Sequence, residues 1–140
     1  MKSTPVIVDT NVVVAGLLTA SEGSPVVRIL DGMLSAAFPF VVSEVLLLEY
    51  RSVLLRPAIR RRHGMTVDEI DSMLTSLVHP AIVLQPAPGA VAPDAGDQLL
   101  WDILNADQRL YLVTGDRVLL NDDSMRGRVL SAAEFVAAWA

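Results

Sequence analysis

Short apolar runs alternate along the chain with longer stretches in which apolar residues recur every three or four positions. The short runs are rich in Val, Ile and Leu, which is typical of strands buried on both faces. They predict strands at 6–8, 40–42, 82–84, 111–113 and 129–130. The periodic stretches predict helices at 12–20, 25–37, 43–55, 66–78, 94–107 and 132–140, with a short helical turn after 116. Residues 56–64 are expected to form a basic connector and residues 85–93 a proline-rich loop.

Strand and helix therefore follow one another through the whole sequence, without an internal repeat or an evident linker. Parallel strands need crossover connections, which helices usually provide, so this order predicts an α/β fold. We expect a three-layer α/β/α sandwich with a mostly parallel central sheet. We also expect one domain over residues 1–140.

The composition narrows the class of protein. Of 140 residues, 52% are hydrophobic and 19% are charged, which is too apolar for a disordered chain. There is no cysteine, so a disulfide framework, a thiolate zinc site and a cysteine nucleophile are excluded. The longest apolar stretches, 12–20 and 38–48, are shorter than the ~20 residues that span a bilayer. The N-terminus lacks the long apolar core of a signal peptide, so we expect a soluble, cytoplasmic protein.

A carboxylate follows the strand in each of four predicted strand–helix units. These residues are Asp9, Glu44, Glu49, Asp94, Asp97 and Asp116. Each one alone is more often a helix cap or a turn former. Because the carboxyl ends of parallel strands meet at one edge of the sheet, the acids are also expected to lie close together. Clustered carboxylates repel one another, and a divalent cation with oxygen ligands, Mg²⁺ or Mn²⁺, would offset that repulsion.

Other chemistries with acids at strand ends fit less well. A phosphoaspartate switch and a haloacid-type phosphatase both need a Lys near the site, and the only lysine, Lys2, precedes the first strand. The phosphatase also needs a second Asp where Asn11 stands. A P-loop, a dinucleotide-binding glycine motif and a Gly-x-Ser-x-Gly elbow are absent from the sequence. His63 and His79 are predicted to be surface residues rather than zinc ligands or a general base.

The ordered set of motifs resembles a PIN domain over essentially the whole chain. The motifs are Asp9-Thr10-Asn11 after the first strand, Ser43 followed six residues later by Glu49, Asp97-x-x-Leu, and Thr114-Gly115-Asp116 after the fourth strand. The Arg-Pro pair at 56–57 and the Thr-Gly-Asp sequence are similar to the bacterial VapC-like toxin components of type II toxin–antitoxin systems.

This resemblance implies a metal-dependent ribonuclease that hydrolyses RNA through a metal-activated water and leaves a 5′-phosphate. Asp9, Glu49, Asp97 and Asp116 match the acidic quartet of the family, and Asn11 and Thr114 match polar residues that support it. The implied ligands of Mg²⁺ or Mn²⁺ are Asp9, Asp97 and Asp116, with Glu49 aiding a second ion or orienting water. Glu44 does not match the family pattern. The roles of Asp94, Asp122 and Asp123 stay open.

An acidic enzyme must still bind a polyanion. The net charge of −5 and the pI near 4.8 argue against a broad basic face. The densest basic cluster consists of Arg56, Arg60, Arg61, Arg62 and His63. It is either a phosphate-contacting surface or an ordinary solvated connector, and the same two interpretations apply to Arg117.

The sequence also bears on partners and on rival functions. Trp101, Trp139 and the apolar last helix favour packing in the core or against a partner. The resemblance implies a homodimer and a cognate antitoxin protein. Two alternatives stay open, a PIN nuclease of RNA processing that is not a toxin and a catalytically silent RNA- or protein-binding module whose acids are caps.

Overall fold

The computed structural model describes residues 4–125 and 127–139, and Lys2 lies outside them. The strands of this part are β1 (Val6–Val8), β2 (Val41–Ser43), β3 (Ile82–Leu84), β4 (Tyr111–Val113) and β5 (Val129–Leu130). The helices are α1 (Thr10–Leu18), α2 (Pro25–Leu34), α3 (Glu44–Leu54), α4 (Pro57–His63), α5 (Val67–Val78), η1 (Ala95–Asp97), α6 (Gln98–Ala106), α7 (Arg117–Leu120) and α8 (Ala132–Trp139).

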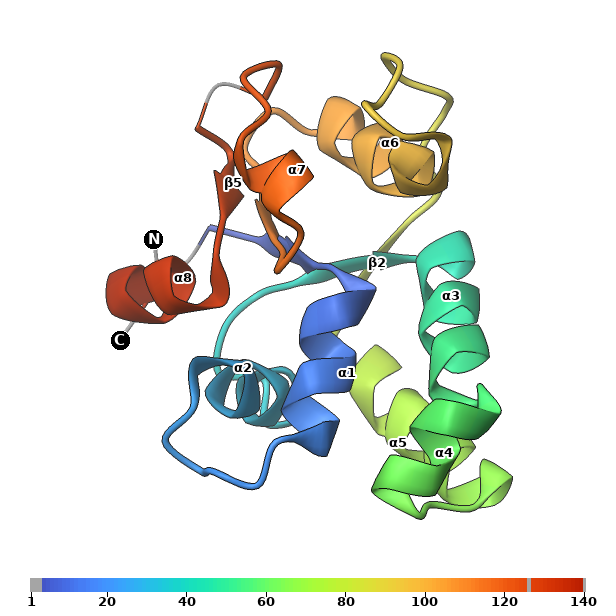
Figure 1. Cartoon of the computed structure of the whole chain (residues 1–140). Helices are drawn as coiled ribbons and strands as arrows, with labels where there is room; N and C mark the ends of the chain where they lie inside the picture. The colour runs from blue at the N-terminus through green and yellow to red at the C-terminus, as the bar shows by residue number, and fades with distance from the viewer. Residues whose placement is uncertain (1–3, 126, 140) are drawn as a thin grey trace.

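All strand pairings are parallel, as the sequence predicts. β1 pairs with β4 and β4 with β5, while β2 pairs with β3. A parallel bridge between Val6 and Phe40 lies where these two groups meet, so the strands follow the order β3-β2-β1-β4-β5. Figure 1 shows the strands between α6 on one side and α1 and α2 on the other. The protein is thus an α/β sandwich with a parallel sheet as its middle layer.

The core forms around β1, whose three residues are fully buried. Trp101 is buried in α6, so it belongs to the core. The apolar face of α8 also packs within the chain. The Phe135 ring lies 5.0 Å from that of Phe38, and Trp139 lies 4.9 Å from Phe38, measured between ring centroids. These contacts account for the apolar residues of the last helix without a partner.

The basic segment after α3 is helical, so the prediction of a connector over 56–64 was wrong. Pro57 occupies the first turn of α4, and Gly64 ends it in the left-handed conformation at φ 68°. His63 is half-buried, because its ring lies 2.9 Å from the Leu54 carbonyl oxygen and accepts a hydrogen bond from the Met65 amide. His63 is thus only partly exposed at the surface, whereas His79 is exposed.

Three further boundaries differ from the sequence prediction. The first helix begins directly after Asp9, and the second ends at Leu34 rather than near 37. The helix predicted from 94 starts as the 3₁₀ turn η1, and α6 begins only at Gln98. β3 is an edge strand rather than a buried one, because Ile82 and Val83 keep 44% and 53% of their surface exposed.

α1 and α2 approach each other closely at Gly16. A Cβ atom at this position would lie 2.7 Å from the carbonyl oxygen of Val26 and 2.9 Å from the Cβ of Leu30. The absence of a side chain therefore lets the two helices pack at this distance.

None of the helices in residues 4–125 and 127–139 has the length and apolar character that crossing a membrane requires.

Candidate active site

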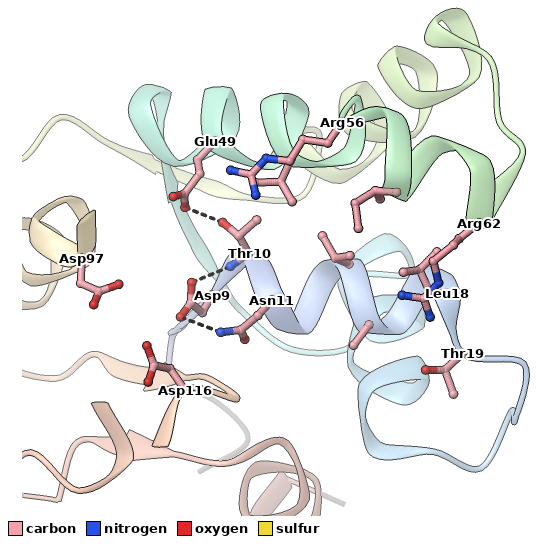
Figure 2. Close-up of a pocket in the computed structure, with 14 residues that line it drawn as sticks. Asp9, Thr10, Asn11, Leu18, Thr19, Glu49, Arg56, Arg62, Asp97 and Asp116 are labelled. Atoms are coloured by element: carbon pink, nitrogen blue, oxygen red, sulfur yellow. Dashed lines mark hydrogen bonds between the residues drawn. The ribbon is translucent and has the colours of Figure 1, made fainter. Parts of the chain in front are cut away.

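The four acids of the predicted quartet line one pocket of about 500 Å³ at the carboxyl edge of the sheet. Figure 2 shows their side chains around a common space. They come from separate parts of the sequence. Asp9 follows β1, Glu49 lies on α3, Asp97 lies in η1, and Asp116 follows β4 through Thr114 and Gly115. Because β1 and β4 are adjacent parallel strands, Asp9 and Asp116 reach the same edge.

Asp9 is held by several hydrogen bonds. Its Oδ1 accepts from the backbone amide of Thr10 at 2.7 Å, which makes Asp9 the N-cap of α1. Its Oδ2 accepts from the Thr114 hydroxyl at 2.7 Å and from the Asn11 amide at 3.3 Å. Asp9 is therefore both the N-cap of α1 and a member of the acidic pocket, and it is only 7% exposed.

Asn11 and Thr114 connect the start of α1 to the loop after β4. The Asn11 Oδ1 accepts from the Gly115 amide at 2.9 Å. Thr114, fully buried, donates to Asp9 and accepts from the Asp116 amide at 3.0 Å. These two residues thus fix the positions of Asp9 and Asp116 relative to each other.

Glu49 is tied to the same region by Thr10 and by its neighbour Tyr50, to which the sequence prediction gave no role. The Thr10 hydroxyl donates to Glu49 Oε2 at 2.5 Å. The adjacent Tyr50, which is fully buried, donates its hydroxyl to the carbonyl oxygen of Val8, the last residue of β1. Burial raises the pKa of Tyr50, with the charges of Asp9 and Glu49 adding to the effect, so it stays a donor. The position of Thr10 between Asp9 and Asn11 was the available sequence signal.

Of the acids in the pocket, Asp97 has the most strongly shifted pKa. Burial raises its pKa to about 6, and the charges of the neighbouring acids add to the shift; these are Asp9, Asp116, Asp94 and Glu49. The pKa of Asp9 is also raised, first by burial, although its hydrogen bonds oppose the shift. The Asp116 Oδ1 accepts from the Val118 amide at 2.9 Å and caps α7.

The donor set fits a hard divalent cation. All four side chains offer carboxylate oxygens, which suit Mg²⁺ or Mn²⁺ better than Zn²⁺. Burial first, and mutual repulsion second, raise the pKa values of Asp9 and Asp97, and a bound cation would offset both effects. Within residues 4–125 and 127–139, no three of the Asp, Glu and His side chains already stand close enough to share one ion. The carboxylates therefore face a common space without forming a finished coordination sphere.

The other acids considered from the sequence do not line this pocket. Glu44 lies at the exposed start of α3 beside a different depression. Asp94 caps η1 by accepting from the Gly96 amide at 2.8 Å. Asp122 accepts from the Ser124 amide at 2.9 Å within a turn, and Asp123 is exposed in the same turn. Asp94 thus serves as a helix cap and Asp122 stabilises a turn, and these roles account for the presence of their carboxylates.

The structure divides the arginine cluster. Arg56 and Arg62 line the pocket together with the acids. Arg60 and Arg61 line a separate depression with Pro57 and residues 64–66. Arg117 is exposed on α7 and is not among the residues lining the acidic pocket.

Comparison with known proteins agrees with the geometry. A family model described as "PIN domain" matches residues 5–118, which includes all four acids of the pocket. None of the curated proteins compared with this chain gives a significant match. Since the match covers most of the sequence, the chain belongs to the PIN domain family, a family of nucleases.

Proposed function

We propose that the protein is a divalent-metal-dependent endoribonuclease and the toxin of a type II toxin–antitoxin pair. The observation that carries metal dependence is the pocket of four carboxylates, in which burial and neighbouring acids raise the pKa of Asp97 to about 6. Active sites commonly contain such uncompensated charge because a ligand supplies the missing partner.

The proposed ligands of Mg²⁺ or Mn²⁺ are Asp9, Asp97 and Asp116. When bound, the cation would supply the charge that activates water near neutral pH and offsets the charge developing on the phosphate. Glu49 is proposed to aid a second ion or to orient water.

The chain's own residues prepare these groups. Asn11 and Thr114 hold Asp9 in place, so its carboxylate need not reorganise during the reaction. For Glu49, only Oε2 is hydrogen-bonded within the described part of the chain, which leaves Oε1 to accept a hydrogen bond from water. Water attack on phosphorus breaks the bond to the 3′ oxygen, which leaves as a 3′-hydroxyl and yields a 5′-phosphate.

The proposed substrate is RNA. Of the arginines expected from the sequence to contact phosphate, Arg56 and Arg62 are the candidates at the pocket, with exposed Arg117 a further one, whereas Arg60 and Arg61 face a separate depression. Because the net charge is −5, attraction to a polyanion must be local rather than spread over the surface.

Cleavage of a labelled single-stranded RNA tests the metal-dependent activity. Wild type should cleave with Mg²⁺ or Mn²⁺ and lose activity with EDTA, and Asp9→Asn should be inactive with either ion. Undiminished cleavage in EDTA and by Asp9→Asn would contradict the mechanism. Titration calorimetry with Mn²⁺ gives an independent check, because a catalytically silent binding module whose acids serve as caps should bind no ion.

The toxin role rests on the Arg-Pro and Thr-Gly-Asp similarity to VapC-like proteins, which also implies a cytoplasmic homodimer and an inhibitory antitoxin. Expression of the gene without a neighbouring antitoxin gene should arrest growth, and Asp9→Asn should relieve the arrest. Normal growth with an active nuclease would instead favour a role in RNA processing.

A further inference from the structure

The pocket that holds the four acids continues along α1 toward α4. α1 forms one wall through Thr10, Asn11, Val14, Ala15 and Leu18, together with Thr19, which directly follows the helix. These positions recur at intervals of four, so they lie on one face of the helix. The other wall consists of Glu49 and Val53 of α3, then Arg56, then Ile59 and Arg62 of α4. We call this continuous feature the α1 groove.

The chemistry of the α1 groove changes along its length. The acids lie at the end near the start of α1, and Leu18 and Arg62 lie at the other end, as Figure 2 shows. Thr10 and Leu18 are eight positions apart on the helix, which corresponds to about 12 Å at 1.5 Å per residue. Aliphatic side chains line the part between, namely those of Val14, Val53 and Ile59.

Arg56 and Arg62 are exposed and point into the α1 groove. Among the described residues, neither guanidinium forms an ion pair, in contrast to Arg51 and Arg109, which pair with Asp71 and Asp107. Each of the two arginines therefore presents free donors on a groove wall, where a phosphate can accept them.

We infer that the α1 groove binds the single-stranded RNA flanking the cleaved bond, with Arg56 and Arg62 contacting phosphates beyond the acids and the aliphatic wall receiving riboses or bases. This inference rests on the proposed function, because the acidic end must hold the phosphate that is cleaved. A groove of this length is long enough for more than one nucleotide. A single strand suits it because unstacked bases can reach the aliphatic side chains, whereas a duplex keeps its bases inside the helix.

The arginine cluster itself offers a matched control. Arg60 and Arg61 lie on the same helix, but they face the separate depression beside Gly64. The double variants Arg56→Gln/Arg62→Gln and Arg60→Gln/Arg61→Gln change the net charge equally. A difference between them therefore reports position and not total charge.

Binding of a fluorescein-labelled single-stranded RNA, measured by anisotropy in EDTA, tests the contacts without requiring cleavage. Loss of two phosphate contacts should flatten the slope of log Kd against log salt by about 1.4, from about 0.7 per contact for single strands. We expect this for Arg56→Gln/Arg62→Gln and an unchanged slope for Arg60→Gln/Arg61→Gln. Equal slopes for the two variants would overturn the inference. Circular dichroism confirms that each variant is folded.

Cleavage with Mg²⁺ or Mn²⁺ gives a second measurement. Arg56→Gln/Arg62→Gln should raise KM for the single-stranded RNA by about tenfold or more, the effect of losing a charged hydrogen bond, with little change in kcat. The control variant should keep the KM of wild type. A KM that rises equally in both variants would also overturn the inference.

These outcomes separate the two proposals. If wild type binds RNA with the expected arginine dependence but cleaves it with neither ion, the proposed function fails and the groove assignment stands. If wild type cleaves RNA but Arg56→Gln/Arg62→Gln binds and cleaves like wild type, the groove assignment is wrong. The α1 groove would then be open to a protein segment instead.

Discussion

Asp97 and Asp107 flank the same helix, yet their pKa values are shifted in opposite directions. Asp97 precedes α6 and Asp107 follows it. The helix dipole favours a negative charge at the first end and disfavours it at the second. The two pKa values have the reverse order, because that of Asp97 is raised to about 6 and that of Asp107 is lowered to about 2.

The neighbours of each carboxylate explain the reversal. Burial and the surrounding acids raise the pKa of Asp97. Asp107 accepts hydrogen bonds from the side chain and the backbone of Arg109, and these lower its pKa. Arg128 also donates to the carbonyl oxygens of Leu104, Asp107 and Leu110 at 2.7, 2.8 and 2.9 Å. Charged donors therefore hold one end of α6, while the other end carries charge that nothing in the described chain neutralises.

The largest effect expected from this difference is on activity. Asp97→Asn should lower kcat in Mg²⁺ or Mn²⁺ by more than about a hundredfold, the upper range for residues that only support a metal ligand. Asp107→Asn removes one carboxylate from the opposite end and should leave kcat close to that of wild type. Similar losses in both variants would mean that helix integrity, rather than the acidic pocket, is being measured.

The next largest effect is on stability and concerns Arg128. Arg128→Met leaves three carbonyl oxygens without their charged donor, so the free energy of unfolding should fall by about 3 kcal/mol in urea denaturation. Arg109→Met is the control, because Arg109 is exposed in its pair with Asp107 and exposed pairs contribute little to stability. Equal costs for the two variants would contradict the assignment of Arg128 as the anchor of α6.

The two carboxylates should also respond oppositely to pH in metal-free protein. The pKa of Asp97 is raised in the folded state, so ionisation of its carboxyl group destabilises the fold. The free energy of unfolding therefore falls as the pH rises from about 4 to about 6. Asp97→Asn should therefore raise Tm at neutral pH in EDTA and leave Tm unchanged below about pH 4. Excess Mg²⁺ should reduce or reverse the gain by stabilising only wild type.

Asp107→Asn provides the opposite sign. In wild type, the lowered pKa of Asp107 contributes stability that is present above about pH 4 and is lost as the pH falls toward about 2. The variant should lower Tm slightly at neutral pH, and the difference should shrink in acid. Thermal melts of both variants with the same sign at neutral pH would refute the comparison.

Glu49 is held by one hydrogen bond, from the Thr10 hydroxyl. Thr10→Val should lower kcat by about tenfold, the lower range for a residue that orients another, with a smaller effect on KM. Thr10→Ser keeps the hydroxyl and should restore most of the activity. If the serine variant is as impaired as the valine variant, the effect comes from packing at the start of α1.

Much of the fold could be predicted because its strands and most of its helices repeat apolar residues regularly. α4 could not, since among its arginines only Ile59 gives an apolar signal. Pro57 and Gly64 were the available markers of its two ends. The edge position of β3 was also hidden, because an apolar run such as Ile82–Leu84 does not tell which strands flank it.

For the site, strand ends could be located from the apolar runs, which placed six acids near one edge of the sheet. The resemblance to the PIN family, rather than the strand ends, selected the four that line the pocket and left out Glu44 and Asp94. The sequence could not separate Arg56 and Arg62 from Arg60 and Arg61, because that division depends on the helix that was missed. It also could not identify Val14 and Leu18 as groove walls, because apolar residues on a helix usually indicate the core.

Gly16 has a consequence for the groove that lies on the other face of its helix. Because α1 forms a wall of the groove and Gly16 sets its contact with α2, any side chain at position 16 must push the two helices apart. The carbonyl of Val26 is backbone and cannot yield as a flexible side chain could. A displacement of α1 away from α2 would be toward α3 and α4, which form the other wall. A methyl group at position 16, which does not line the α1 groove, would in this way narrow it. Gly16 therefore influences from a distance which ligands the α1 groove can admit.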